Sequence, residues 1–369
     1  MRAANEIDFW RGFALVSIFV NHIPGGFAFE RVTHRNYGLS DSAELFVFLA
    51  GWALRQTADN ANEPLGLARL VLRLGSRAVT LYAAQILITM LAIALIAATA
   101  IILENPLLLE WHNAAAVFAD PVPTHLGLVL LTHQLGFFDI LPLYVVLMFG
   151  APIMAVVHRL APAVLLPLSL ALYGAALTFR INLPTWPVEG VWFFDPFAWQ
   201  LVFVLGFKLG RDHGVGGLVR HHLGWLRPLA WIAVAVGAFV VLSDYEPDPT
   251  RVPDPKLFFV FDKSYLSPAR LLHFLAVATA FAGAYRYLAG SLSPVTDFLS
   301  LLGRNSLNVF CVGSLLSLAG QLVRVALGGS LWVDTGVLVL GIAVLGLTGW
   351  LSELRDRLRR LPAPSPSRS

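Results

Sequence analysis

The sequence predicts an all-α membrane protein built as a polytopic bundle of transmembrane helices. Of its 369 residues, 57% are hydrophobic and only 13% are charged, whereas a soluble domain carries about 25% charged residues. Its mean hydropathy is +0.70. A chain with 26 basic and 23 acidic residues lacks the charge to cover a core of this size in water. The composition therefore excludes a soluble enzyme and a disordered protein.

Ten apolar segments are candidate membrane spans. A helix needs about 20 mostly apolar residues to cross the hydrocarbon core, and the clearest segment, 78–103, contains no charged residue. The segments 41–57 and 197–210 are short, and a partly re-entrant course is the alternative for both. The expected spans are 12–30, 41–57, 78–103, 137–157, 162–178, 197–210, 227–243, 268–289, 305–327 and 334–353.

The distribution of charge predicts the orientation. With the N-terminus in the cytoplasm, most Lys and Arg side chains fall in inside loops and most carboxylates fall outside, as the positive-inside rule requires. We therefore expect both termini to be cytoplasmic. Residues 1–355 would form one transmembrane domain and 356–369 a short basic Pro/Ser-rich tail. Because the basic residues are spread over several loops, we expect no nucleic acid partner. The single cysteine, Cys311, gives neither a disulfide framework nor a Cys-cluster metal site, and we expect no metal.

His22 is the first candidate for a functional group inside the membrane. It follows Arg11 by eleven residues, which is about 16 Å along a helix, so it lies near the bilayer midplane if Arg11 is at the inner interface. Pro24, Gly25 and Gly26 follow and should break the helix. A histidine at this depth beside a broken helix indicates a functional cavity. The structural alternative is a neutral histidine that hydrogen-bonds a neighbouring helix.

Asp41 and Glu44 begin the next apolar segment. Their spacing fits a capping box, with Asp41 as N-cap and Glu44 three residues later, and this explains Asp41 better than Glu44. The same spacing puts both carboxylates on one helix face, which can point toward the first span. A carboxylate there would orient the imidazole of His22, as a catalytic histidine requires. His22, Asp41 and Glu44 are therefore the candidate catalytic residues.

Three arginines, Arg69, Arg73 and Arg77, recur at every fourth residue before the charge-free span. One interpretation is a basic amphipathic helix lying on anionic lipid. The other is a docking stripe for a multiply phosphorylated cytoplasmic ligand. Arg11 lies three residues after Asp8, where an ion pair at a helix end is the simpler interpretation.

Other polar residues mark the ends of later spans: Tyr144, then Asp195, Trp199 and Gln200, and then Arg304. Taken singly, each is ordinary for a helix end. The loops that separate the spans hold aromatic residues beside carboxylates, a pattern typical of either a membrane interface or a sugar site. No nucleophile elbow, P-loop or zinc-protease motif stands in a suitable context. This leaves the histidine with its carboxylates as the predicted reaction centre.

The segments IDFWRG, NHIP and RNYGLSDSAELFVFLAG resemble the N-terminal signature of the OpgC family. These proteins are membrane succinyltransferases that modify osmoregulated periplasmic glucans, and they are similar to the wider type 3 acyltransferase superfamily. The segments LYAAQI, DILPLYVVLM, DPFAWQLVFVLG and LGRNSLNVF follow in the family's order. The resemblance thus covers about residues 5–350.

The resemblance implies a multi-pass protein of the bacterial inner membrane. Its donor would be acyl-CoA from the cytoplasm, succinyl-CoA by analogy, bound only as a substrate and not as a permanent cofactor. Its acceptor would be a hydroxyl group of a periplasmic glucan, with His22 as the catalytic histidine. We expect the CoA phosphates to bind Arg11, Arg69, Arg73, Arg77 and Arg304. We expect the substrate site to include Asn21, Tyr144, Asp195, Trp199 and Gln200.

This chain departs from the family pattern at two positions. Asn21 stands where many members have an acidic residue before the histidine, and Asp195 stands where asparagine is usual. In our scheme Asn21, or an arginine from another span, stabilises the oxyanion. Three alternatives stay open: a covalent acyl-histidine relay, the same chemistry on another surface polysaccharide, and a transporter or flippase in which His22 and the carboxylates relay protons.

Overall fold

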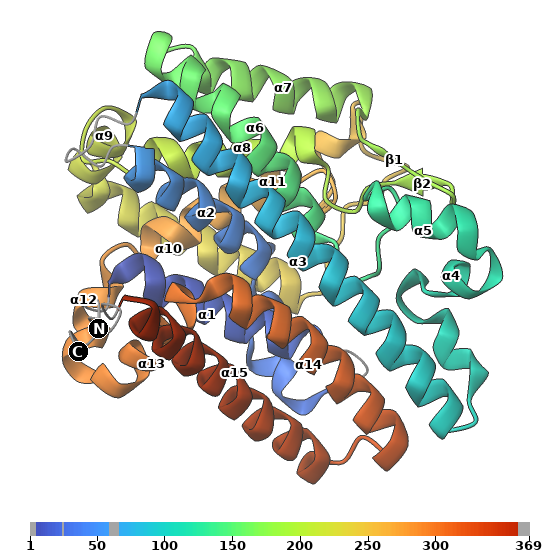
Figure 1. The fold of residues 1–369 in the computed structure, drawn as a ribbon. Helices are drawn as coiled ribbons and strands as arrows, with labels where there is room; N and C mark the ends of the chain where they lie inside the picture. Colours follow the sequence, from blue (N-terminus) through green and yellow to red (C-terminus); the bar gives the residue numbers. More distant parts are fainter. Residues whose placement is uncertain (1–4, 24–25, 59–65, 361–369) are drawn as a thin grey trace, which may run out of the picture.

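The computed structural model describes residues 5–23, 26–58 and 66–360. Within these ranges the fold is helical apart from one short hairpin (Figure 1). The elements up to the hairpin are α1 (Glu6–Asn21), η1 (Ala28–Val32), η2 (His34–Tyr37), α2 (Ser42–Ala58), α3 (Leu67–Ile102), η3 (Pro106–Asn113), α4 (Ala115–Ala119), α5 (Pro121–Val129), α6 (Ile140–Leu160) and α7 (Leu165–Phe179). The hairpin and the elements after it are β1 (Pro184–Thr185), β2 (Gly190–Val191), α8 (Pro196–Leu209), α9 (Val215–His221), α10 (Leu223–Leu242), η4 (Lys256–Phe258), α11 (Pro268–Ala280), α12 (Ala284–Ser291), α13 (Ser293–Arg304), α14 (Ser306–Leu327) and α15 (Leu331–Arg360).

Each of the ten expected spans contains a helix, but fewer of these helices could cross a membrane alone. Among the described residues five are long and apolar enough, namely α3, α6, α10, α14 and α15. A sixth arises if α11 and α12, which are bent by 50° at a short break, form one span. Helices α7 and α8 are apolar but shorter. The protein is therefore an all-helical membrane protein with five or six candidate spans, while the number ten and the orientation of the termini stay predictions.

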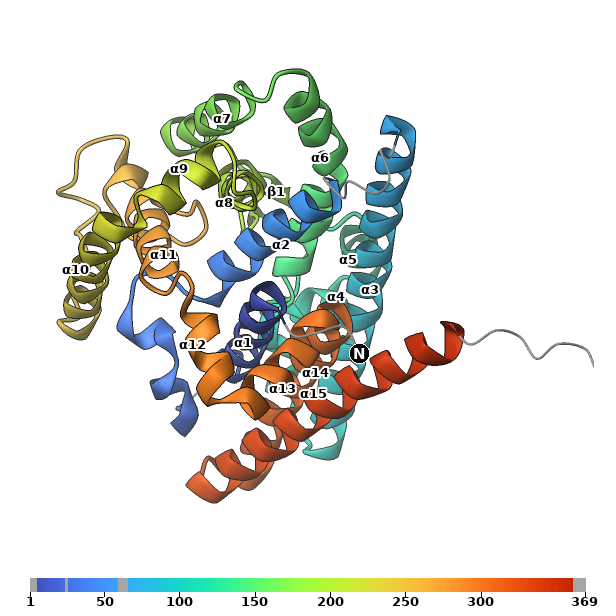
Figure 2. The ribbon, with the colours of Figure 1, turned by 90° about the vertical axis from the view of Figure 1, so that its left-hand side faces the viewer.

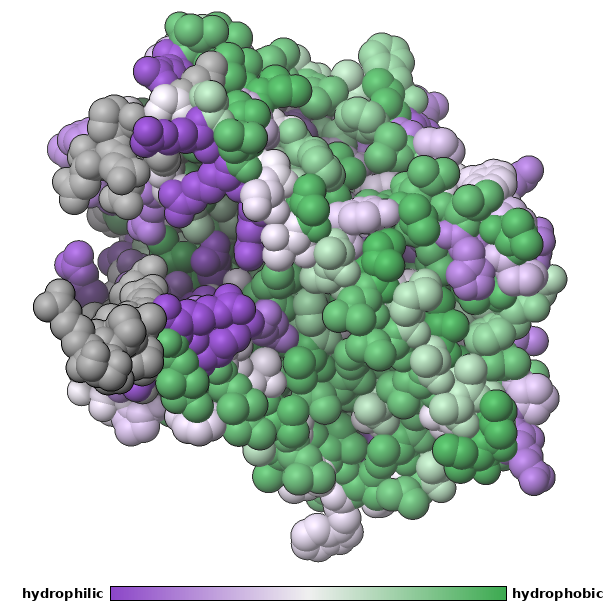
Figure 3. Space-filling model, in the orientation of Figure 1, coloured by the Kyte–Doolittle hydropathy of each residue, from purple (hydrophilic) through white to green (hydrophobic). Residues whose placement is uncertain are grey.

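The surface agrees with a membrane location. On the face drawn in Figure 3, hydrophobic side chains cover the broad middle of the molecule. Hydrophilic side chains gather at the left margin and at the right margin of the same view. Helix α10 contributes to this apolar surface, because only 11% of its most apolar 18-residue stretch is buried inside the protein. Apolar side chains in such numbers can stay exposed only where lipid covers them.

Helix α1 is shorter than the expected span 12–30. It begins at Glu6, with Asn5 as N-cap, and ends at Asn21 with His22 as its C-cap. Two 3-10 turns, η1 and η2, then lead into α2. The break predicted from the Pro24-Gly25-Gly26 sequence occurs here, although Pro24 and Gly25 themselves lie outside the described residues.

Helix α1 runs through the middle of the bundle, surrounded by other helices (Figure 2). It crosses α13 so closely that a Cβ atom on Gly12 would strike the backbone of Leu299, and one on Gly303 would strike the backbone of Asp8. A similar crossing joins α2 and α8 through Gly51 and Gly206, each of which faces the backbone of the other helix. Small residues allow backbones to approach in this way in membrane helices. These two crossings fix the helices that carry the candidate catalytic residues.

Two helices are longer than the expected spans. Helix α3 begins at Leu67 and includes the arginine stripe, so the stripe and the charge-free segment form one continuous helix of 36 residues. Helix α15 continues to Arg360, so the first residues of the predicted tail are helical. Residues 361–369 of that tail lie outside the described residues.

Candidate active site

His22 lies where α1 ends, with its ring against an aromatic side chain. The centroids of the His22 and Phe137 rings are 4.8 Å apart. Its ring nitrogen Nδ1 is buried and has no hydrogen-bond partner in the part of the chain that the structure describes. A buried imidazole nitrogen without a partner is costly, and in a reaction centre it is free to accept a proton from a substrate.

The backbone of His22 is held from two other segments. The side-chain Nε2 of Gln321, on α14, donates to the carbonyl oxygen of His22 at 2.5 Å. The Oε1 of the same Gln321 lies 2.8 Å from Nε2 of His112, in η3. Burial lowers the pKa of His112, and the hydrogen bond to Gln321 opposes that shift. A neutral His112 that donates from Nε2 completes the chain from η3 to the end of α1.

Asn21 ties the end of α1 to the following loop. Its Oδ1 accepts a hydrogen bond from the Thr33 hydroxyl at 2.7 Å, and that hydroxyl also donates to the carbonyl of Glu30. The Asn21 amide is thus engaged in positioning the loop that leads to Asp41. Its role as a substrate or oxyanion contact stays a prediction.

Asp41 and Glu44 form the predicted capping box, and their charges are balanced by two cations from distant segments. Glu44 accepts from the Asp41 backbone N–H at 2.9 Å, and Asp41 accepts from the backbone N–H of Ala43. Lys263 donates to Oδ2 of Asp41 at 2.5 Å. Arg270, on α11, donates to Oε1 of Glu44 at 2.7 Å and lies 3.5 Å from Asp41. The four side chains form one buried ionic network.

Neither carboxylate hydrogen-bonds to His22. The charged groups of Asp41, Lys263 and Arg35 nevertheless lie within electrostatic range of the imidazole. The structure therefore brings His22 and Asp41 into one polar region, and the carboxylate acts on the imidazole through its field rather than through a direct bond.

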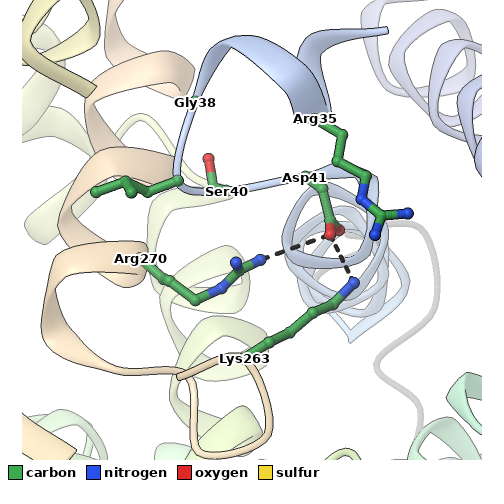
Figure 4. A pocket seen from close by; sticks show the side chains of 7 residues that line it. Arg35, Gly38, Ser40, Asp41, Lys263 and Arg270 are labelled. Atoms are coloured by element: carbon green, nitrogen blue, oxygen red, sulfur yellow. Dashed lines mark hydrogen bonds and ion pairs between the residues drawn. The ribbon is translucent and has the colours of Figure 1, made fainter. Parts of the chain in front are cut away.

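A pocket of about 160 Å³ opens beside this network. Figure 4 shows Asp41 between Lys263 and Arg270, with Arg35 on its other side. Arg35 is half-exposed, and its ion pair with Glu30 is loose at 3.8 Å. The pocket is lined by Arg35, Gly38, Leu39, Ser40, Asp41, Lys263 and Arg270.

The start of α8 holds Lys263 in place. The Asp195 backbone N–H donates to the carbonyl of Ser264 at 3.0 Å. The Trp199 indole N–H donates to the carbonyls of Lys263 and Ser264, both at 3.1 Å. The Asp195 carboxylate caps α8 by accepting from the backbone N–H groups of Phe197 and Ala198. Asp195 and Trp199, which were predicted to contact substrate, thus position a pocket residue in this structure.

Two further predicted substrate residues lie elsewhere in the packing. Gln200 accepts from the Ser169 hydroxyl at 2.6 Å and donates to the Ser169 carbonyl, which joins α8 to α7. Tyr144 is partly buried on α6, with its ring 6.1 Å from that of Phe46. Neither lines the pocket beside Asp41.

The five arginines predicted to bind CoA phosphates lie in three settings. Arg69, Arg73 and Arg77 are exposed near the start of α3. Arg11, on α1, donates to the carbonyl of Leu49 at 3.2 Å. Arg304 donates to Glu353 on α15 at 2.7 Å, and both side chains are mostly buried.

Sequence reasoning missed the cations of the pocket, although signals were present. Arg270 lies inside the expected span 268–289, where an ionisable residue is a functional candidate by default. Lys263 is one of three lysines in the whole chain and lies in an aromatic loop. Gln321 carried no comparable signal, because a glutamine in an apolar helix is an ordinary contact between helices.

The described residues, 5–23, 26–58 and 66–360, hold no group of three or more His, Cys, Asp or Glu side chains that could bind a metal ion.

The fold and the site together define a helical membrane protein in which a buried histidine ring and a network of charged side chains lie near the end of the central helix. The family model for the OpgC protein matches residues 3–357. The chain therefore belongs to the OpgC family, which gives it a membrane acyltransferase-type role. No curated protein and no solved structure matches the chain.

Proposed function

We propose that this protein transfers a succinyl group, or a similar acyl group, from acyl-CoA to a hydroxyl group of a periplasmic glucan, with His22 as general base. The observation that carries this is the His22 ring. Its Nδ1 is buried without a partner, at the broken end of the central helix and within electrostatic range of the pocket cations. A general base needs a free nitrogen beside a space that a hydroxyl group can reach.

A carboxylate near His22 supports the step in which the imidazole becomes protonated. When His22 takes the hydroxyl proton it becomes an imidazolium, which a negative charge nearby stabilises. Asp41 is the acidic group within electrostatic range of His22. Lys263 and Arg270 pair with Asp41 and Glu44. Lys263 and Arg35 also lie within electrostatic range of His22 and keep its imidazole neutral before the reaction, as a base requires.

The positive groups favour an acyl chain that ends in a carboxylate. Three cations, Arg35, Lys263 and Arg270, face two carboxylates, Asp41 and Glu44, in and beside the pocket. The excess cation is Arg35, whose pair with Glu30 is loose. A succinyl group carries a free carboxylate that suits this arginine, whereas an acetyl group does not.

In the proposed topology the donor and the acceptor reach His22 from opposite sides of the inner membrane. The exposed arginines Arg69, Arg73 and Arg77, assisted by Arg11 and Arg304, would bind the CoA phosphates in the cytoplasm. The pocket lies beside the loop that leads into α2 and the start of α11, and His22 is not among the residues that line it. The glucan therefore need not cross the membrane.

The test is transfer by purified protein in detergent, with succinyl-CoA and a soluble glucan. Replacing His22 by alanine should lower the transfer rate about 100-fold or more, which is the usual contribution of a general base. His133→Ala is the matched control, because His133 is also buried but donates to the carbonyl of Asn113. Wild-type rates in folded His22→Ala protein would overturn the proposed role of His22.

The same assay separates the enzyme from a transporter or flippase, because transport needs a sealed compartment and catalysis does not. Mass spectrometry of glycans from cells with and without the gene identifies the acyl group. It also shows whether the acceptor is a periplasmic glucan or another surface polysaccharide.

A further inference from the structure

Ser40 and His273 form a hydrogen-bonded pair at the pocket that the mechanism above does not use. The Ser40 hydroxyl lies 2.8 Å from Nδ1 of His273, within the range expected for a nucleophile and its base. Ser40 comes from the loop before α2, and His273 comes from α11. Ser40 lines the pocket between Gly38 and Asp41 (Figure 4).

The protonation state of His273 follows from its contacts. The Ser40 backbone N–H also donates to Nδ1 of His273, at 3.3 Å. A backbone N–H can only donate, so Nδ1 carries a lone pair and the ring proton of the neutral imidazole is on Nε2. The Ser40 hydroxyl must then donate its proton to Nδ1. This is the polarity that activates a serine for attack.

The imidazole of His273 is fixed in this orientation by its surroundings. A Cβ atom on Gly38 or on Gly237 would overlap the His273 ring, so the ring lies tightly between two backbones. Its Nε2 is buried and has no hydrogen-bond partner among the described residues. A histidine kept only to satisfy polar groups would not leave one nitrogen buried without a partner.

Ser42, two residues after Ser40, provides a comparison. The hydroxyl of Ser42 is buried and makes no hydrogen bond to a described residue. Ser42 is the first residue of α2, so the protein tolerates a buried serine hydroxyl without a partner close to Ser40.

We propose that Ser40 is a nucleophile that carries the acyl group as an ester, with His273 as its base. The inference rests on the proposed function and deepens it, because it makes the transfer a two-step reaction. It assigns the first step to Ser40 and His273 and leaves the acceptor step to His22.

The first step consumes an acyl thioester. The Ser40 oxygen attacks the thioester carbonyl while its proton passes to Nδ1 of His273. The C–S bond breaks, an ester bond forms on Ser40, and the departing thiolate takes the proton from His273. In the second step an acceptor hydroxyl loses its proton to His22 and attacks the ester. The ester C–O bond breaks, the Ser40 oxygen takes up the proton that His22 removed from the acceptor, and the glucan carries the acyl group.

Arg270 is placed to stabilise the oxyanion of the first step. It uses Nε and Nη2 for Glu44 and Asp41, so the N–H groups of Nη1 remain for the tetrahedral intermediate. Removing one donor that is already oriented toward such an intermediate lowers kcat about 100- to 1000-fold in measured cases. Arg270 also lines the pocket beside Ser40.

The decisive experiment is exchange of labelled CoA into succinyl-CoA by purified full-length protein in the absence of glucan. Exchange requires an acyl-enzyme, and it is detected even if water slowly removes the acyl group. We expect the wild type to exchange, Ser40→Ala to lose both exchange and transfer, and the matched control Ser42→Ala to keep both.

His22→Ala should keep exchange and lose transfer, because His22 acts only on the acceptor. Ser40→Cys should form a thioester that neutral hydroxylamine cleaves, which locates the acyl group by mass spectrometry at position 40. A thiol ionises more readily than a hydroxyl group. His273→Ala should therefore impair Ser40 protein about 100-fold and Ser40→Cys protein much less, a pattern that loss of structure would not give.

The outcomes separate the two proposals. A wild type that transfers succinyl groups without exchange, or a folded Ser40→Ala protein that still exchanges, overturns the acyl-serine and leaves the proposed function intact. Exchange that is lost in His22→Ala but kept in Ser40→Ala would place the acyl group on His22 instead. A wild type with neither activity refutes the proposed function itself.

Discussion

Charged side chains are buried and paired beside the pocket, whereas they are exposed near the start of α3. Beside the pocket, Asp41 and Glu44 are buried, and each is paired with a cation from a distant segment. Near the start of α3, Arg69, Arg73 and Arg77 are exposed on one helix. The buried charges are satisfied by one another and give the site a fixed geometry. The exposed guanidinium groups are accessible to a ligand, and a soluble phosphorylated donor requires such accessible arginines.

The largest effect should follow from breaking the buried network at Glu44. Glu44→Gln leaves the Arg270 charge without its main partner, and removing one member of a buried ion pair costs about 3–5 kcal/mol. Thermal unfolding in detergent measures this loss. Asp212→Asn is the control, because it breaks the exposed ion pair of Asp212 with Arg220 and should cost about 1 kcal/mol or less.

The double variant Glu44→Gln/Arg270→Gln should recover part of the stability, since both charges are then removed together. Equal losses for Glu44→Gln and Asp212→Asn would show that the buried network contributes no more to stability than an exposed ion pair.

A smaller effect is expected at Trp199, which positions Lys263 from outside the pocket. Trp199→Phe removes the N–H that the carbonyls of Lys263 and Ser264 accept, at a cost of about 1–3 kcal/mol. Because Lys263 then loses its fixed place at Asp41, kcat should fall while the KM for acyl-CoA stays unchanged.

Trp192→Phe is the matched control for this substitution. The indole N–H of Trp192 is buried without a hydrogen-bond partner among the described residues, so its loss removes no bond. If both variants lose kcat equally, Trp199 does not act through Lys263.

Replacing the three exposed arginines should affect donor binding and leave stability unchanged. In Arg69→Gln/Arg73→Gln/Arg77→Gln protein we expect the KM for acyl-CoA to rise about tenfold, which corresponds to 1.4 kcal/mol. Its dependence on ionic strength should also become weaker, because the lost interactions are between exposed charges. The corresponding lysine variant keeps the charges and serves as control. An unchanged KM would favour the lipid-binding interpretation of the stripe.

The smallest effect concerns the choice of acyl donor. Arg35→Gln removes the excess cation of the pocket, and its half-exposed guanidinium limits the effect to about 1 kcal/mol, or about fivefold. The kcat/KM for succinyl-CoA should fall by that factor, while that for acetyl-CoA stays the same. A parallel fall for both donors would remove Arg35 from recognition of the acyl carboxylate.

The sequence predicted the helical membrane fold and the break after α1, because composition and helix-breaking residues act locally. It also predicted the capping box of Asp41 and Glu44, which depends on spacing alone. It could not place Lys263 or Arg270 beside those carboxylates, since they are more than two hundred residues away along the chain. Asp195 and Trp199 were recognised as notable residues, but their contacts with the loop of Lys263 depend on tertiary packing.

The bounds of the helices are the second feature that the sequence did not predict correctly. Hydropathy alone extends a span through Ile23 and Phe27, because both are apolar, whereas the structure ends α1 at Asn21. In the same way the segment 268–289 is apolar apart from Arg270, His273 and Arg286, but it bends by 50° between α11 and α12. Ile23 and Phe27, beyond the end of α1, are buried inside the protein, and a sliding average of hydropathy cannot distinguish this from burial in lipid.

The two close helix crossings have a consequence for how substrates reach the site. Gly12 and Gly303 hold α1 against α13 backbone to backbone, and Gly51 and Gly206 do the same for α2 and α8. Neither α1 nor α2 can turn or slide without losing these contacts. Alternating access requires one half of a transporter to rock against the other, and the helices that carry His22 and Glu44 are poorly suited to such motion. A reaction centre on these helices would be stationary, and both proposed substrates would have to diffuse to it.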